Sequence, residues 1–250
     1  MHKDKIFGIN PVTEALKAGR PIQRILIAEQ RKSDRDVLEI VRLAKGRQTE
    51  VRFVTRDALK REVPSVLHQG VIAIAAAREY ATLEDILQLP AQKGQVPLYL
   101  VLDGVEDPRN LGAILRTAEA TGVHGVIIPE RRAVGLTEAV AKTAAGALEY
   151  VPVVKVANIA NMLEELKKEG VWVAGAEVGG DMLYWDADFV RPTAMVLGGE
   201  GKGVRRLVKE RCDYLLSIPL MGSITSLNVS VAAGVLLYEA LRQRRGKDSP

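Results

Sequence analysis

The sequence predicts an α/β protein with two domains of unequal size. The apolar segments between residues 98 and 220 are continuous rather than alternating, which is typical of parallel strands covered on both faces. Stretches of helical periodicity separate these segments. The charge is uneven, because residues 1–75 hold 15 Lys and Arg against 9 Asp and Glu, whereas the remainder holds 20 against 22. A basic module on a near-neutral body indicates an anionic macromolecular partner, with a solvated basic face as the alternative.

The first 77 residues alternate helix and strand signals and predict a small α/β domain. In NPVTEALKAG, Asn10 is the candidate N-cap and Pro11 the first helical residue. A second helix is expected after a cap at Ser33 or Asp34. The expected strands are RILIAE, EVRFVT and GVIAIAAA.

Residues 78–97 are the candidate linker, because a short helix capped by Thr82 is followed by Pro90, Gly94 and Pro97. Residues 98–250 then form the larger domain. Its expected strands are LYLVLDGV, GVIIPE, VPVVKV, GVWVAGAE, TAMVLGGE and YLLSIPL. Ligands of parallel sheets bind beyond the carboxyl ends of the strands, so the loops after these segments are where chemistry is expected.

Several protein classes are excluded or disfavoured. Cys212 is the single cysteine, which excludes an internal disulfide framework and fits a reducing cytoplasm. It is interpreted as a packing or surface residue. His2, His68 and His124 are scattered and form no metal-ligand spacing, so no metal site is expected. There is no GxSxG nucleophile elbow, and no apolar run reaches the roughly 18 residues of a membrane span. We therefore expect a soluble protein that is neither a metal hydrolase nor a serine hydrolase.

The first candidate loop lies in LDGVEDPRNLGAILRTAEATG. Asn110 is near the start of the expected helix and Arg116 is on an early turn. At roughly 100° per residue the two are about 120° apart, so they share a site only if the loop folds over the helix. In the structural alternative, Asn110 caps the helix and Arg116 pairs with Glu106 or Glu119.

The second candidate loop, MVLGGEGKGVRRL, resembles a nucleotide-binding loop but matches neither familiar pattern. A Walker loop would need Gly at Val196 and Ser or Thr at Gly203, and the glycine spacing does not fit a dinucleotide fingerprint. What remains is a backbone that a ligand can approach closely, with Glu200 at the strand end and Lys202 and Arg205 nearby. A plain tight turn is the alternative.

The third candidate segment, YLLSIPLMGSITSLNVSVAAGVLLYEAL, predicts a strand, a polar loop and a helix. Ser226 or Asn228 can supply the N-cap, and the free backbone N–H groups at that helix end can receive a ligand. A cap by itself does not explain Ser230.

In this order, the three segments resemble the three motifs of the SpoU-type ribose 2′-O-methyltransferases of the SPOUT superfamily. INPVTEAL and HQGV resemble the ribosomal-protein-like RNA-binding domain of the branch that methylates a guanosine ribose in 23S rRNA. The resemblance implies a deep trefoil knot in residues 98–250, a homodimer with a shared site, and rRNA as the partner. A cytoplasmic location and no DNA or membrane partner are expected as well. Ala144 and Gly199 depart from the residues that relatives often carry.

The resemblance also implies a cofactor and a reaction centre. S-adenosylmethionine would be held by the backbone around Gly198, Ile218 and Leu227. A guanidinium is effectively never deprotonated, so the motif arginine is expected to orient the acceptor and stabilise negative charge rather than act as a base. The implied reaction-centre residues are Asn110, Arg116, Glu200, Ser226 and Asn228.

Three other functions are weighed against this one. A tRNA ribose 2′-O-methyltransferase would share the catalytic domain and differ in the RNA-binding domain. A non-catalytic RNA-binding protein on the same scaffold is opposed by the intact polar residues of the three motifs. A nicotinamide oxidoreductase is disfavoured by the failed dinucleotide fingerprint.

Overall fold

The computed structural model describes residues 3–64, 68–201 and 203–245, so His2 and Lys202 lie outside the described residues. The chain divides into two compact units. Unit 1 is Met1–Glu79 with Leu136–Tyr150, and unit 2 is Tyr80–Gly135 with Val151–Pro250. No helix among the described residues is both long and apolar enough to cross a membrane.

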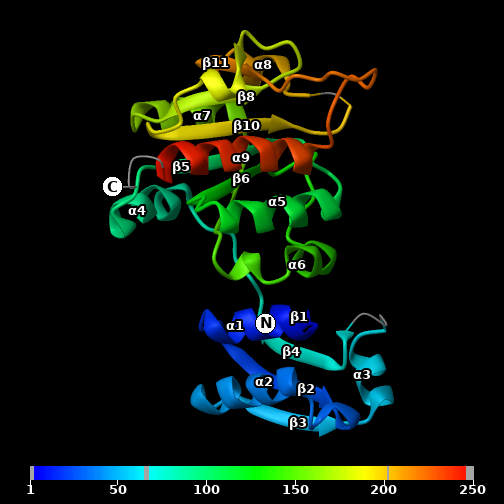
Figure 1. Cartoon of the computed structure of the whole chain (residues 1–250). Helices are drawn as coiled ribbons and strands as arrows, with labels where there is room; N and C mark the ends of the chain where they lie inside the picture. The colour runs from blue at the N-terminus through cyan, green and yellow to red at the C-terminus, as the bar shows by residue number, and fades with distance from the viewer. Residues whose placement is uncertain (1–2, 65–67, 202, 246–250) are drawn as a thin grey trace. The chain divides into compact units, whose positions relative to one another are not determined.

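Unit 1 is built on a mixed four-stranded sheet in the order β1-β4-β2-β3 (Figure 1). β4 runs antiparallel to both β1 and β2, whereas β2 and β3 are parallel. The strands are β1 (Lys3–Phe7), β2 (Ile22–Ala28), β3 (Glu50–Val54) and β4 (Val71–Ala76). The helices are α1 (Ile9–Lys17), α2 (Arg35–Gly46), α3 (Arg56–Glu62) and α6 (Glu138–Ala144), with 3-10 turns η1 (Glu29–Arg31) and η3 (Ala147–Glu149). The three predicted strands are confirmed, and β1 and α3 were not predicted.

Helices cover both faces of the unit 1 sheet. α1 and α2 pack on one face, where Val37, Ile40 and Ala44 of α2 are buried. α3 packs on the other face through Leu59. The predicted N-cap of α1 was wrong, because the helix begins after Gly8, whose φ of 99° suits glycine.

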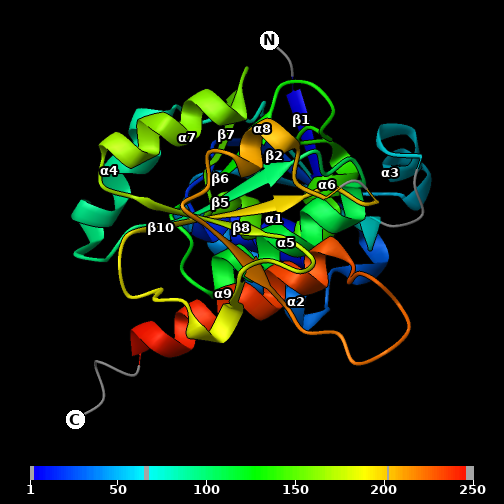
Figure 2. The same ribbon diagram turned by 90° about the horizontal axis from the view of Figure 1, so that it is seen from above.

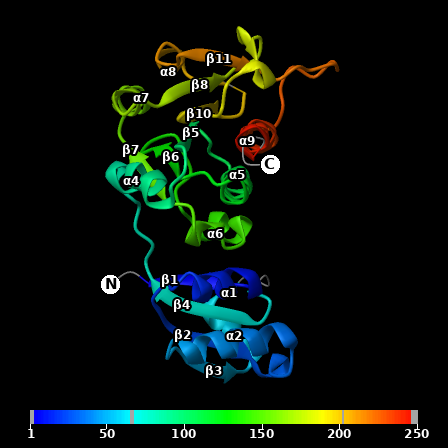
Figure 3. The same cartoon turned by 60° about the vertical axis from the view of Figure 1, so that its left-hand side comes forward.

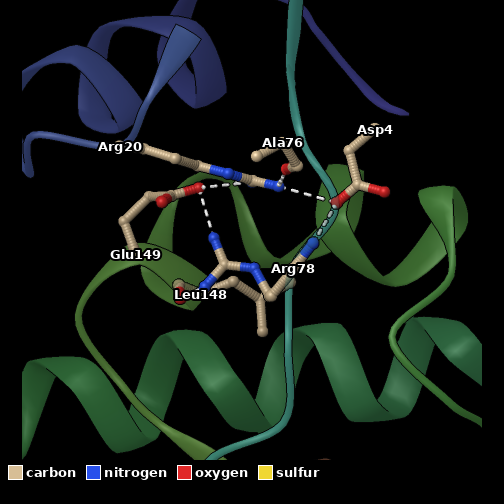
Figure 4. Close-up of polar contacts among 6 residues, drawn as sticks. All are labelled: Asp4, Arg20, Ala76, Arg78, Leu148 and Glu149. Atoms are coloured by element: carbon tan, nitrogen blue, oxygen red, sulfur yellow. Dashed lines mark hydrogen bonds and ion pairs between the residues drawn. The ribbon is translucent and has the colours of Figure 1, made fainter. Parts of the chain in front are cut away.

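The segment Leu136–Tyr150 is fastened within unit 1 by a buried ion cluster (Figure 4). Glu149 Oε1 lies 3.2 Å from Arg20 Nη1 and 2.5 Å from Arg78 Nη2. Arg20 also pairs with Asp4, at 2.6 Å. Burial lowers the pKa of the Arg78 guanidinium, and Glu149 opposes that effect. One buried carboxylate thus holds two arginines of the N-terminal part of the chain.

Unit 2 is built on a parallel seven-stranded sheet in the order β7-β6-β5-β10-β8-β11-β9. Its strands β7, β6, β5, β10 and β8 can be found in Figure 2. The strands are β5 (Leu98–Asp103), β6 (Gly125–Pro129), β7 (Val153–Val156), β8 (Trp172–Ala176), β9 (Met182–Leu183), β10 (Thr193–Gly198) and β11 (Tyr214–Ser217). All six predicted strands are confirmed, and the two-residue edge strand β9 was not predicted.

Helices also cover both faces of the unit 2 sheet, with α4, α7 and α8 on one face and α5 and α9 on the other (Figure 3). The helices are α4 (Leu83–Lys93), α5 (Pro108–Ala120), α7 (Ile159–Lys168), α8 (Arg206–Lys209) and α9 (Val229–Arg245), with a 3-10 turn η4 (Tyr184–Asp186). Thr82 caps α4 with a capping box, and the helix continues to Lys93, past Leu87, where the predicted short helix ended.

The strand order brings three loops to one edge of the unit 2 sheet. The chain runs outward from β5 to β6 and β7 and then continues on the other side of β5, so the order reverses between β5 and β10. Because all the strands are parallel, the loops at 104–107, 199–204 and 218–228 meet at the carboxyl edge, where such sheets bind ligands. Threading of the chain as a trefoil knot stays a prediction.

Candidate functional site

A cavity of about 450 Å³ opens at the carboxyl ends of β8, β10 and β11. Its volume lies in the range that holds a drug-sized molecule. The walls are the glycine-rich loop after β10, the loop before α9 and the first turn of α9. Five of the predicted site residues line it: Gly198, Glu200, Ile218, Ser226 and Leu227.

The glycine-rich wall of the cavity leaves no space for side chains at Gly198 and Gly199. A Cβ on Gly198 would lie 1.9 Å from the carbonyl carbon of Gly203, and one on Gly199 would lie 1.9 Å from the Gly104 oxygen. The Gly203 N–H donates to the Gly199 carbonyl at 3.3 Å and closes the turn. The backbone itself therefore forms this wall. The departure at Gly199 has a structural reason, because only glycine can pack this closely against Gly104.

A buried carboxylate holds the glycine-rich loop onto β5. The Asp103 side chain is 0% exposed, and its Oδ1 accepts from Arg205 Nε at 2.7 Å and lies 2.5 Å from Nη2. Its Oδ2 accepts from the Arg205 backbone N–H at 2.8 Å. The sequence interpretation missed Asp103 as a site residue, although an acid at the end of the fully apolar run LYLVLD was a visible signal.

Asn110 does not cap α5, so that part of the structural alternative was wrong. The N-cap is Asp107, whose Oδ1 accepts from the Arg109 N–H at 2.7 Å, and Pro108 is the first helical residue. Asn110 lies in the first turn with its amide free for other contacts. Its Nδ2 donates to Glu200 Oε1, and its Oδ1 accepts from Asn228 Nδ2 at 3.1 Å.

Asn228 caps α9 and is itself held by Ser230. Its Oδ1 accepts from the Ser230 backbone N–H at 2.9 Å and from the Ser230 hydroxyl at 2.6 Å. Ser230 therefore fixes the orientation of the Asn228 amide, which turns its Nδ2 toward Asn110. A hydrogen-bonded amide chain runs from Ser230 through Asn228 and Asn110 to the Glu200 carboxylate. It joins the three predicted motifs.

Arg116 and Ser226 lie outside this amide chain. Arg116 is exposed on α5, and among the described residues its guanidinium makes no hydrogen bond or ion pair, so the alternative pairing with Glu106 or Glu119 is not found. Ser226 lines the cavity and likewise makes no hydrogen bond within the described part of the chain. Of the two, only Ser226 is among the residues that line the cavity.

The remaining titratable candidates serve packing. Burial raises the pKa of the Cys212 thiol to about 12, which disfavours the reactive thiolate. Burial lowers the pKa of His124 to about 4, and its Nδ1 accepts from the Leu98 N–H at 3.1 Å. His68 Nδ1 accepts from the Gly70 N–H at 3.0 Å. Among the described residues, no three His, Cys, Asp or Glu side chains converge as metal ligands.

Comparison with known proteins assigns the class. Residues 97–238 match the SpoU rRNA methylase family, and residues 5–81 match the substrate-binding domain of RNA 2′-O ribose methyltransferases. The Bacillus subtilis protein YacO, named for the TrmH family of tRNA/rRNA methyltransferases, is 45% identical over 241 residues and 96% of each chain.

Solved structures match almost the whole chain. The SpoU methyltransferase AviRb from Streptomyces viridochromogenes, in complex with the cofactor AdoMet, superposes with a TM-score of 0.81 at 27% identity, over 98% of this chain and 91% of AviRb. An rRNA methyltransferase from Sinorhizobium meliloti gives 0.78 at 25% identity, over 96% and 87%.

The fold and the site thus define an RNA 2′-O-ribose methyltransferase with a separate substrate-binding domain. The chain belongs to the SpoU/TrmH family, whose cofactor is S-adenosylmethionine.

Proposed function

We propose that this protein transfers a methyl group from S-adenosylmethionine to the ribose 2′-hydroxyl of a guanosine in 23S rRNA. The observation that carries the proposal is the amide chain from Ser230 to Glu200 beside the glycine-walled cavity. The rRNA substrate is supported by the family description and by the likeness to the Sinorhizobium meliloti rRNA methyltransferase over 96% of the chain. The guanosine is supported by the resemblance of the INPVTEAL and HQGV segments.

The cavity walls fit S-adenosylmethionine. Apolar Ile218 and Leu227 suit the adenine ring, and the bare backbone at Gly198 allows close hydrogen bonds to its edge. When bound, the cofactor supplies a methyl group activated by a sulfonium. In this proposal Glu200 and Ser226, which line the same cavity, contact the acceptor ribose.

The protein's own task is to position the acceptor hydroxyl, because orientation accounts for much of the acceleration of such a displacement. Glu200 Oε1 is occupied by Asn110, whereas Oε2 has no partner among the described residues and is available to accept a hydrogen bond from the 2′-hydroxyl. Arg116 remains a cation and stabilises the negative charge that develops on the acceptor oxygen or holds a neighbouring phosphate.

The domain roles follow the division of charge. In this proposal residues 1–77 hold the RNA, residues 78–97 connect, and residues 98–250 carry out the transfer in the cytoplasm, where the rRNA is. A homodimer is supported by large apolar side chains that unit 2 leaves exposed on α9 and the loop before it. They are Val231 at 51%, Tyr238 at 55%, Met221 at 99% and Ile224 at 78%.

The test is transfer of labelled methyl from S-adenosylmethionine to 23S rRNA from cells that lack this activity, followed by mapping of the modified nucleotide. Label on one guanosine ribose is expected. Label on tRNA instead would identify a tRNA methyltransferase. Cofactor binding in a calorimeter without methyl transfer to either RNA would contradict the proposed identity of the substrate. Absence of cofactor binding would favour a non-catalytic RNA-binding protein.

The site assignment is tested by two variants. Arg116→Ala is expected to abolish transfer without affecting the fold, because the side chain is exposed and makes no bond among the described residues. Asn228→Asp keeps the capping oxygen of α9 but loses the Nδ2 donor to Asn110, so it is expected to reduce kcat at least 100-fold while the helix stays intact. Retained turnover in both variants would show that the reaction centre lies elsewhere.

A further inference from the structure

Two arginines follow β6 at the carboxyl edge of the unit 2 sheet. Arg131 and Arg132 are exposed, and within the described residues neither guanidinium makes a hydrogen bond or ion pair. Glu106 lies on the loop after β5 and Glu130 directly follows β6, but neither carboxylate pairs with these arginines among the described residues. Their positive charge is therefore available to a partner.

Most arginines of unit 2 are already engaged. Arg205 pairs with Asp103, Arg211 with Glu164 and Arg242 with Glu239, and Arg244 donates to backbone carbonyls. Besides Arg245 at the end of α9, the arginines whose guanidinium makes no hydrogen bond or ion pair in the described residues are Arg109, Arg116, Arg131 and Arg132. The partnerless arginines of this unit are thus concentrated between residues 109 and 132, on α5 and the loop after β6.

The loop that carries Arg131 and Arg132 is anchored next to the reaction centre. The Val134 N–H donates to the Val105 carbonyl at 3.0 Å, which ties this loop to the one after β5. The loop after β5 in turn touches the glycine-rich loop, because a Cβ on Gly199 would lie 1.9 Å from the Gly104 oxygen. β6 pairs with β5 and β5 with β10, so the carboxyl ends of β6 and β10, from which the two loops leave, lie about 10 Å apart.

We infer that Arg131 and Arg132 bind the phosphate backbone of the RNA beside the nucleotide that is methylated. This inference rests on the proposed function and deepens it. A guanidinium binds phosphate oxygens through two parallel N–H bonds and keeps its charge at any physiological pH. Each phosphate neutralised by a cation releases a counterion, which makes the affinity depend on salt. Such contacts position the RNA and do not read its sequence.

The experiment compares the full-length protein with a double variant and a matched control. Arg131→Gln is combined with Arg132→Asn, because Arg132 has φ 59° and asparagine tolerates this left-handed backbone. The control is Arg245→Gln, another exposed arginine without a partner among the described residues, which the 17-residue helix α9 separates by about 25 Å from the carboxyl edge. The readouts are affinity for a 23S rRNA fragment between 50 and 300 mM KCl, steady-state KM and kcat, and cofactor affinity by calorimetry.

In the double variant the negative slope of log affinity against log salt concentration is expected to become shallower by about 1.4, since each single-strand phosphate contact contributes about −0.7. At about 0.15 M salt this corresponds to roughly tenfold weaker RNA binding and a KM raised by the same factor. kcat at saturating RNA and cofactor affinity should not change, and Arg245→Gln should behave as the wild type.

Two outcomes would overturn the inference. One is an unchanged salt slope and KM in the double variant, and the other is a fall in kcat at constant KM, which would place the arginines at the reacting atoms. The proposed function is judged separately on the wild type. If the wild type binds the fragment but transfers no methyl group, the proposed function fails while the salt slope still decides the role of the arginines. If it binds no RNA, both are wrong.

Discussion

Glu149 is the residue on which the packing of Leu136–Tyr150 within unit 1 depends. We predict that Glu149→Gln destabilises unit 1 by about 3 kcal/mol, because removing one partner of a buried ion pair leaves a buried charge uncompensated, at a cost of about 3–5 kcal/mol. The Glu149 side chain is 8% exposed and those of Arg20 and Arg78 are 12% and 20% exposed. The low end of the range applies because Arg20 keeps its pair with Asp4.

The two units can be followed separately in one urea titration. Trp172 and Trp185 are the chain's two tryptophans, and both lie in unit 2, so their fluorescence reports that unit. Hydrogen exchange of the amides in α1 and in Leu136–Tyr150 reports unit 1. The free energy of opening that hydrogen exchange measures in unit 1 should fall by about 3 kcal/mol. The urea midpoint of the fluorescence transition should not change.

The matched control is Glu138→Gln, which removes a carboxylate from the same segment. Glu138 is exposed and makes no ion pair among the described residues, so its loss should change stability by less than about 0.5 kcal/mol. The reasoning is refuted if Glu149→Gln changes unit 1 as little as Glu138→Gln does. In that case the two arginines would be satisfied by solvent and by their remaining partners.

Three further predictions concern the site and the sheet of unit 2. Gly198→Ala should weaken S-adenosylmethionine binding at least tenfold in calorimetry, because the added Cβ would lie 1.9 Å from backbone. In the control Gly222→Ala the added Cβ meets nothing within 4 Å, so this variant should bind the cofactor normally. Equal affinities of the two variants would contradict this prediction. His124 has a pKa of about 4 when folded against 6.5 unfolded, so the unfolded state takes up a proton first as the pH falls. Unfolding free energy should then drop by about 3 kcal/mol between roughly pH 6.5 and 4, and His124→Gln should remove that part of the pH dependence; an unchanged profile would argue against a neutral buried imidazole. Asp103→Asn should lower the free energy of unfolding by about 2 kcal/mol in urea denaturation, because the Asp103 carboxylate is fully buried but its partner Arg205 is half exposed. Arg206→Gln, which breaks an exposed ion pair, should lower it by less than about 0.5 kcal/mol. Similar losses in the two variants would contradict the burial argument.

The start of α5 shows how local signals compete in a sequence. Both Asp107 and Asn110 are good N-cap residues, and the sequence interpretation named Asn110 alone as the possible cap. Pro108 decides the start, because proline is favoured at the first helical position, directly after the cap. That signal was present in the sequence and was given too little weight. Its consequence is functional, since it releases the Asn110 amide for Glu200 and Asn228.

The elements that were not predicted lack a strong apolar pattern. β1 has five residues, KDKIF, and α3 has seven, of which Leu59 is the buried one. Neither is long enough to establish a period, so only their packing on the sheet of unit 1 defines them. The long apolar strands of unit 2 were recoverable because burial on both faces leaves a continuous apolar run.

The sequence by itself determined the parallel strands, the polar loops at their carboxyl ends and the residue types that chemistry requires. Only the tertiary structure decided that Asn110 meets Glu200, 90 residues away, and Asn228, 118 residues away, and that Ser230 orients the amide chain. It also decided that Leu136–Tyr150 packs with the N-terminal residues through Glu149. The physical reason is range: periodicity and capping act within a few residues, whereas these contacts depend on the order of strands in a sheet and on the loops that the sheet brings together.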